Sequence, residues 1–143
     1  MLIPHVVQTE ADKVFVNILN NQSSSVTDGM PVVWNVSSPD GVRTTQPASG
    51  TLNLLVGLVD GTIAASAYGL AQAYGYKASA SMTNSTGTAV NSGDVLGAVA
   101  ATNYIMYSAA GTALAAGFIY AAESVATATT PAAAAHKVFI RAL

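Results

Sequence analysis

Lys13-Val14-Phe15-Val16-Asn17-Ile18-Leu19 is the clearest strand signal in the chain, and it runs directly into Asn20-Asn21-Gln22-Ser23-Ser24-Ser25. β-Branched and aromatic residues dominate the first segment, and such residues favour strands. The second segment consists of small polar residues, which favour turns. Together they predict a β-strand over residues 13–19 that ends in a polar turn.

The same alternation of strand and turn signals continues along the chain. Turns are predicted at Asp28-Gly29 and at Ser38-Pro39-Asp40-Gly41, where Pro presets the backbone and Gly accepts unusual dihedral angles. Leu52–Val59 is an apolar run interrupted by Gly57, which is typical of a buried strand or of a strand with a β-bulge. The other predicted strands are residues 31–36, 70–76, 77–82, 95–99, 103–107, 118–122 and 137–143.

Many short strands at spacings of about 8–12 residues predict an all-β fold, either an antiparallel β-sandwich or a small β-barrel. We expect at most one or two short helical turns, because the Ala-rich residues 113–116 and 132–135 favour helix but are too few to be stable alone. The length of 143 residues fits one domain. The expected organisation is an N-terminal arm over residues 1–12 and a single β-rich domain over residues 13–143.

One short pattern occurs three times. An aliphatic residue, one spacer and two small residues precede the start of an apolar segment at Ile63–Tyr68, Val90–Val95 and Leu114–Ile119. Such a pattern predicts a structural repeat made of an anchoring side chain, a tight turn and a new strand. Chance recurrence in a chain rich in Ala and Gly is the alternative.

The composition excludes several classes of protein. Charged residues make up 8% of the chain, with five Lys plus Arg, seven Asp plus Glu and no Cys, and Ala, Ser and Thr number 27, 13 and 14. High hydrophobicity with low net charge argues against disorder, and so few basic groups argue against nucleic-acid binding. Without Cys, neither a disulfide framework nor a thiolate metal site can form. A surface with so little charge is best explained if other subunits cover much of it.

An uncharged stretch between Asp94 and Glu123 is long enough to span a bilayer. Its apolar residues are mostly Ala, which gains little from lipid, and it contains polar residues such as Asn103 and Thr112. We therefore expect two buried strands joined by a turn of small residues, not a membrane span. The first residues of the chain lack the basic region of a secretory signal.

No catalytic pattern stands out in the sequence. His5 and His136 lie near opposite termini and lack the spacing of metal ligands. Asp60 and Asp94 are the least unreasonable carboxylate pair for a hydrolase, but each adjoins a Gly, where Asp commonly stabilises a turn. We therefore expect a protein without enzymatic activity, cofactor or metal.

Aromatic residues offer a further possibility. Tyr74 and Tyr76 would share one face of a strand, close in sequence to Tyr68, and aromatic rings on a sheet face can bind sugars. The same rings also suit a hydrophobic core or a contact between subunits, and we favour that interpretation. Trp34, in a valine-rich strand, is expected to anchor the core.

A resemblance to a known family is carried by five segments spread over most of the chain. They are Lys13-Val14-Phe15-Val16, Asp28-Gly29-Met30-Pro31-Val32-Val33-Trp34, the stretch from Gly57 to Tyr76, Ser92-Gly93-Asp94-Val95-Leu96, and Lys137 to Leu143. In these turn-and-strand segments the chain resembles the capsid decoration, or cement, proteins of tailed bacteriophages. The resemblance implies a β-rich subunit, frequently a homotrimer, that binds the major capsid protein on the outside of the capsid.

The expected function is that of a virion structural protein that cements neighbouring capsid subunits, with no nucleic-acid or membrane partner. A tail or fibre subunit, or a glycan-binding subunit of the virion, is the alternative. A chain without Cys suits assembly in the reducing cytoplasm of a host bacterium, followed by residence on the capsid surface.

Both ends of the chain supply candidate contacts, because an apolar segment can add a strand to the open edge of a neighbour's sheet. At the amino end, Pro4 disfavours a central strand, so an arm lying on a partner and a disordered start are both open. At the carboxyl end, pairing within the chain is favoured over pairing with a neighbour. The candidate capsid or subunit contacts are Leu2, Ile3, Pro4, His5, Val138, Phe139 and Ile140.

Overall fold

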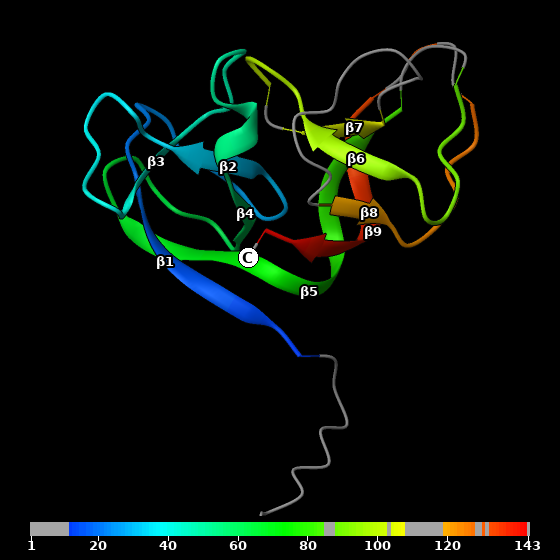
Figure 1. The fold of residues 1–143 in the computed structure, drawn as a ribbon, viewed down its shortest axis with the longest axis horizontal. Coiled ribbons are helices and arrows are strands. Elements are labelled where there is room, and N and C mark those ends of the chain that lie inside the picture. Colours follow the sequence, from blue (N-terminus) through cyan, green and yellow to red (C-terminus); the bar gives the residue numbers. More distant parts are fainter. Residues whose placement is uncertain are drawn as a thin grey trace, which may run out of the picture.

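The computed structural model describes residues 12–84, 88–102, 104–107, 119–127, 130 and 132–142. Within these residues the chain forms nine β-strands and one turn of 3₁₀ helix, so the prediction of an all-β fold is confirmed (Figure 1). The elements are β1 (Val14–Asn20), β2 (Pro31–Trp34), β3 (Arg43–Thr45), η1 (Leu52–Leu54), β4 (Leu55–Asp60), β5 (Tyr68–Thr83), β6 (Val95–Ala98), β7 (Ile105–Tyr107), β8 (Ile119–Ala121) and β9 (Ala134–Arg141).

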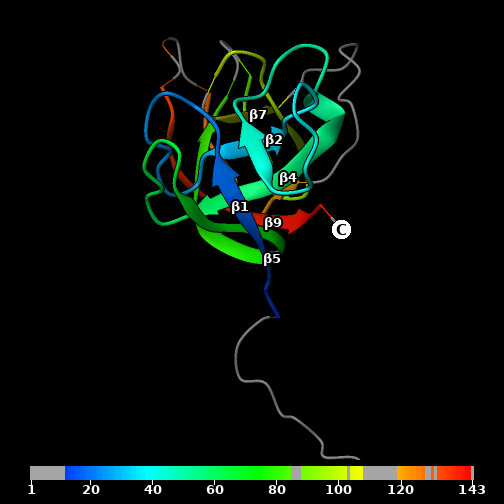
Figure 2. The same cartoon turned by 90° about the vertical axis from the view of Figure 1, so that its left-hand side faces the viewer.

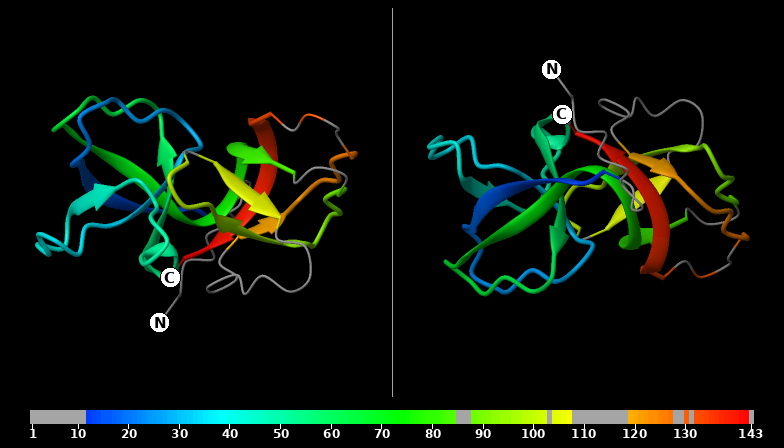
Figure 3. Two further views of the ribbon diagram at one scale, coloured as in Figure 1. Left: turned by 90° about the horizontal axis from the view of Figure 1, so that it is seen from above. Right: turned by 90° about the horizontal axis from the view of Figure 1, so that it is seen from below.

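The strands close into two circuits that share β5. In lobe 1 the order is β1, β3, β2, β4 and β5, and β5 pairs back onto β1. In lobe 2 the order is β5, β7, β6, β8 and β9, and β9 pairs back onto β5. Among the described strands the parallel pairs are β1–β3 and β5–β7, so the fold is mainly antiparallel, as expected. Figure 3 shows the two lobes side by side, with β5 passing from one to the other.

The length of β5 differs from the short strands that the sequence predicts. Its 16 residues run unbroken from Tyr68 to Thr83, where two strands over 70–76 and 77–82 were expected. A register shift against β9 between Lys77 and Ala80 accompanies its passage into lobe 2. Because the strand lines two circuits in turn, its buried and exposed residues do not alternate with one regular period.

Each lobe has its own hydrophobic core, and β4 contributes to both. Val56 and Val59 belong to the lobe 1 core, whereas Leu55 and Leu58 of the same strand belong to the lobe 2 core. The lobes are therefore packed together through β4 as well as joined through β5. The other buried core residues are Ile18, Val26, Val32, Ile63 and Ala71 in lobe 1, and Ala80, Met82, Val90, Leu96, Ala98, Ile105, Ile119, Ala121, Val138 and Ile140 in lobe 2.

Gly57 allows β4 to approach β5 closely. A Cβ atom at this position would lie 2.2 Å from the carbonyl oxygen of Gln72, so no larger residue fits unless the backbone moves. The pairing of β4 with β2 also shifts register here and leaves Val56 as an extra residue, which is a β-bulge. The sequence left open whether residues 52–59 form a buried strand or a bulged one. Residues 52–54 form η1, and the strand that follows, β4, is both buried and bulged.

The two lobes have the same connectivity, strand for strand. β1 corresponds to the second half of β5, while β2, β3, β4 and the first half of β5 correspond to β6, β7, β8 and β9. Matching residues lie 64 positions apart through β2 and β6, and 62 apart in β3 and β7 and in β4 and β8. The difference arises because the segment 35–42 is two residues longer than the segment 99–104. The fold is an internal duplication.

Hydrogen bonds outside the strands repeat in the same way. Val26 and Ile63 exchange two backbone hydrogen bonds of 2.9 Å in lobe 1, and Val90 and Val125 exchange bonds of 2.9 and 2.7 Å in lobe 2. Ile63 and Val90 are both buried, and each is followed by a turn and then by a new strand. The predicted repeat of these segments is not the repeat of the fold, because Ile63 matches Val125 and Val90 matches Val26. The third occurrence, at Leu114, lies outside the described residues.

Three predictions of individual elements need correction. β3 was not predicted, because three residues are too few to show a period. The uncharged stretch from Asp94 to Glu123 holds β6, β7 and β8, which match the predicted strands 95–99, 103–107 and 118–122, and not the two strands that were weighed against a membrane span. Ala134 and Ala135 begin β9, so they are extended, and residues 113–116 lie outside the described residues. No helix in the described part of the chain is long and apolar enough to cross a membrane.

Candidate functional site

Lobe 1 exposes a group of large apolar side chains on β1 and β5, which we name the outer patch. It consists of Phe15, Tyr68 and Leu70, which are 40%, 64% and 45% exposed. Side chains of this size are more often buried, so a group of them on one face of a sheet is a candidate contact surface. Figure 2 looks onto lobe 1 with β1 in front.

The pairing of β1 with β5 places these side chains together. Asn17 lies opposite Leu70, and Phe15 lies opposite Gln72, so Phe15 and Leu70 belong to the same outward face. Leu58 of β4 lies on the other side of Gln72. Along this row Leu58 and Gln72 are buried, whereas Phe15 is exposed. The outer patch therefore begins where the lobe 2 core stops covering the sheet.

The matching face of lobe 2 lacks these apolar side chains. Ser79 stands at the position of Phe15, 64 residues later, and Ala135 lies opposite Ser81 as Leu70 lies opposite Asn17 in lobe 1. Since lobe 2 forms the same circuit with small residues there, the fold does not require apolar side chains on this face. The outer patch is a property of lobe 1 alone.

A group of hydrogen-bonded side chains links the two lobes at their junction. We name it the Lys77 cluster, and it consists of Lys77, Asp28, Asp60 and Ser79. Lys77 on β5 is 5% exposed, and its Nζ donates to Oδ1 of Asp28 at 2.8 Å and to Oδ1 of Asp60 at 3.2 Å. Ser79 also donates to Oδ2 of Asp28, and the Gly61 amide donates to its Oδ1 at 3.0 Å. Two lobe 1 carboxylates thus hold two side chains of the strand that enters lobe 2.

These hydrogen bonds also set the ionisation of Asp28. Partial burial acts to raise the pKa of Asp28, but hydrogen bonds from Lys77, from Ser79 and from the Gly61 amide outweigh it. The pKa of this carboxyl therefore lies below its ordinary value of 3.8. Asp28 remains ionised at neutral pH and balances the buried ammonium group.

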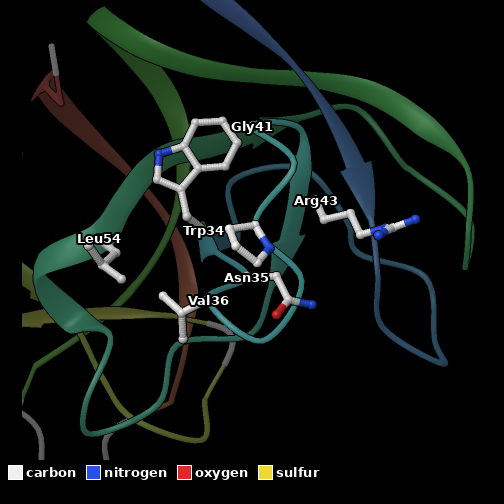
Figure 4. A pocket seen from close by; sticks show the side chains of 7 residues that line it. Trp34, Asn35, Val36, Gly41, Arg43 and Leu54 are labelled. Atoms are coloured by element: carbon white, nitrogen blue, oxygen red, sulfur yellow. The ribbon is translucent and has the colours of Figure 1, made fainter.

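A pocket of about 260 Å³ opens in lobe 1 next to η1 (Figure 4). Trp34 lines it and also packs partly against the lobe 1 core, so the expected core anchor lies at the edge of that core. In Figure 4 the polar ends of Asn35 and Arg43 point away from Trp34, which leaves an apolar space. The lining residues are Trp34, Asn35, Val36, Pro39, Gly41, Arg43 and Leu54.

The predicted contacts at the carboxyl end are used within the chain. Residues 138–140 of β9 pair with β5 on one side and with β8 on the other, so this part of the strand has no open edge. Val138 and Ile140 are fully buried in the lobe 2 core, and this removes them as contacts with another protein. Phe139 meets Tyr74 edge to face, with ring centroids 5.4 Å apart. The amino-end candidates, residues 2–5, lie outside the described residues.

The structure separates the side chains that were weighed for catalysis. Asp60 is bound to Lys77, whereas Oδ2 of Asp94 accepts from the Asn91 amide at 2.7 Å, which is the turn role expected of it. Nδ1 of His136 lies 2.9 Å from Oε1 of Glu123. Among the described residues, no group of three His, Cys, Asp or Glu side chains could hold a metal ion.

Comparisons of the chain with protein-family models, with curated proteins and with solved structures gave no match. The two lobes of the internal duplication can be compared with each other. A feature that both lobes share serves the fold, and a feature that one lobe carries alone is a candidate for function. The outer patch belongs to the second kind, and so does the indole ring of Trp34, whose position is held by Ala98 in lobe 2.

Sequence reasoning missed the outer patch and the Lys77 cluster for different reasons. Phe15 and Leu70 were assigned to strands, but the register between those strands decides that they share an exposed face. Lys77 sits beside Asp28 and Asp60 only because three segments meet at the lobe junction. The spacing of these three residues in the sequence carries no such signal.

Proposed function

We propose that this protein is a structural component of a tailed-phage virion that binds the outside of the capsid and cements neighbouring subunits of the major capsid protein. The observation that carries the proposal is the outer patch, because it is apolar, exposed and absent from the matching face of lobe 2. The resemblance of the strand and turn segments to capsid decoration proteins supports the choice of partner. The low charge of the chain is consistent with a surface covered by neighbours.

Cementing requires several modest contacts that act at once. An exposed patch of three side chains is small beside a typical stable interface of about 800 Å² on each partner. An oligomer that places several such patches on adjacent capsid subunits would bind tightly through multivalency. A homotrimer, as the resemblance implies, would supply this.

Binding to capsids tests the proposal. Purified protein is added to expanded capsids that lack it, and bound protein and capsid melting temperature are measured. We expect saturable, stoichiometric binding that raises the melting temperature. Phe15→Ser and Leu70→Ala each copy the residue of lobe 2 and should weaken binding, whereas Ala135→Ser, on the lobe 2 counterpart face, should not. Absence of saturable binding would overturn the proposal.

Location on the particle separates the capsid from other parts of the virion. In images of virions carrying labelled protein, the proposal requires density over the capsid shell. Density confined to the tail would show instead a tail or fibre subunit, which is the alternative expected from the sequence.

A further inference from the structure

The Trp34 pocket is a feature of lobe 1 that neither the fold nor the capsid proposal uses. Ala98 holds the position of Trp34 in lobe 2, 64 residues later. The segment 99–104 of lobe 2 is also shorter than the pocket-forming segment 35–42. Lobe 2 completes the same circuit of strands without an indole ring at this position and with a shorter segment. The fold therefore does not require the Trp34 pocket, and we consider what could bind in it.

The segment that forms the pocket is held in place by its own side chains. Oδ1 of Asp40 accepts from the amides of Val42 at 3.1 Å and Arg43 at 2.8 Å, and Oδ1 of Asn35 accepts from the Ser37 amide at 2.9 Å. Nε of Arg43 lies 3.4 Å from Oδ2 of Asp40. The charged groups beside the pocket thus neutralise each other, and the pocket is preformed.

The chemistry of the pocket selects an apolar occupant. Val36, which is 57% exposed, lines the pocket together with Trp34, Leu54 and Pro39. Proline-containing segments in extended conformation dock on aromatic-lined pockets of this kind, because their conformation is already restricted. The polar ends of Asn35 and Arg43 point away from Trp34, so the aliphatic and aromatic parts of the lining face the occupant (Figure 4).

The chain itself contains a segment that matches the pocket. Met1-Leu2-Ile3-Pro4-His5-Val6-Val7 carries no Asp, Glu, Lys or Arg, and Pro4 favours an extended conformation at Ile3. Eleven residues precede Asp12, and at about 3.3–3.6 Å per residue they can reach well beyond one lobe. In Figures 1 and 2, η1 and the start of β1 lie at opposite ends of lobe 1, which favours a neighbour's pocket over the chain's own.

We propose that the Trp34 pocket of one copy of the chain receives Ile3 and Pro4 of a second copy. Such a contact joins two different surfaces, so repetition from copy to copy closes into a ring when the rotation allows. This contact between the amino-terminal segment of one copy and the Trp34 pocket of the next would hold the oligomer together without involving the outer patch. The inference does not rest on the capsid proposal, because it concerns contacts between copies in solution.

The single Trp of the chain reports directly on the pocket. For the full-length protein we expect the Trp34 emission maximum to move to shorter wavelength as concentration rises, together with the mass measured by sedimentation. Ile3→Asp should abolish both changes because it places a charge in the apolar pocket. Gln8→Asp introduces the same charge elsewhere in the arm and should leave both unchanged.

Rescue by a peptide completes the test. A synthetic peptide of residues 1–11, added to the Ile3→Asp protein, should restore the shorter emission wavelength with saturation, and the same peptide with Ile3→Asp should not. Emission that does not depend on concentration but does respond to Ile3→Asp would place the arm in its own pocket and overturn the inference. So would loss of mass without any change at Trp34, or an emission maximum that Ile3→Asp leaves unchanged.

Discussion

Asn20 and Asn84 hold the same position in the two lobes, 64 residues apart, and both donate to two matching backbone carbonyls. The carboxamide of Asn20 donates to the carbonyl of Ser24 at 2.9 Å and to that of Ala64 at 3.1 Å. Asn84 donates to the matching carbonyls of lobe 2 at 3.1 and 2.9 Å. Both side chains are buried, so each one fastens a turn to a distant segment within its lobe.

Replacement of either Asn by Ala should lower the free energy of unfolding by about 1–3 kcal/mol, because part-buried carbonyls lose their donor. Asn20→Ala should cost more than Asn84→Ala, since Asn20 also donates to the carbonyl of Ile63. Urea unfolding measures both changes. Asn17→Ala, on the exposed side of β1, is the control and should change the free energy by less than about 0.5 kcal/mol. Equal values for Asn84→Ala and Asn17→Ala would contradict the assigned role.

The Lys77 cluster should respond very differently to loss of its cation and loss of its anions. Lys77→Met replaces the buried ammonium by an apolar group of similar size and should change stability by no more than about 1 kcal/mol, because Asp28 and Asp60 remain hydrated. The double variant Asp28→Ala, Asp60→Ala leaves the ammonium buried without a counter-charge and should cost about 3–5 kcal/mol. Denaturant unfolding distinguishes the two. A larger loss in Lys77→Met than in the double variant would refute this account.

The two lobes should unfold together. Leu58 belongs to β4 of lobe 1 but packs in the lobe 2 core, so Leu58→Ala should destabilise both by about 2–5 kcal/mol. Loss of Trp34 fluorescence reports lobe 1, and hydrogen-exchange protection of the Leu96 amide reports lobe 2. Both probes should give the same free-energy change. Leu70→Ala, at an exposed site, should move neither by a comparable amount, and two separate transitions would be incompatible with the shared strand.

Acid should weaken the fold through Asp28. Its pKa is lower in the folded protein than its ordinary value of 3.8, so its contribution to stability is present above that value and is lost as the pH falls through the folded pKa. Asp28→Asn should therefore show a shallower fall in melting temperature below about pH 4 than the unaltered protein. Ser81→Ala, which removes no carboxyl group, should retain the full fall. An unchanged slope in Asp28→Asn would exclude this carboxyl as a source.

The strands were predictable where residue type alone decides them. β1 is rich in β-branched and aromatic residues, and its predicted range differs from the observed one by a single residue at each end. The duplication was not predictable, since lobe 1 and lobe 2 agree in residue type mainly at special positions such as Asn20 and Asn84. A core position only needs an apolar side chain, so Ile18 in one lobe is matched by Met82 in the other.

The candidate site depended on information that the sequence does not carry. Trp34 was expected in the core because its strand is rich in Val, and the position of η1 beside it is what leaves an open pocket. Val138 and Ile140 were considered as contacts because they are apolar and near the end of the chain. Whether an apolar strand is covered by its own chain or by a neighbour depends on the pairing partners, which only the three-dimensional structure supplies.

Two repeats within one chain can differ in sequence, whereas two copies of one repeat in a homodimer cannot. In a homodimer of one repeat, every substitution would appear on both halves, and the halves would separate on dilution. Here β5 is covalently part of both lobes, so their association does not depend on concentration and each surface can change alone. Corresponding positions can therefore carry different residues, as Trp34 and Ala98 do, and as Phe15 and Ser79 do, although the strand connectivity is the same. Because β5 is shared, one chain carries exposed apolar side chains on one lobe and small residues at the matching positions of the other.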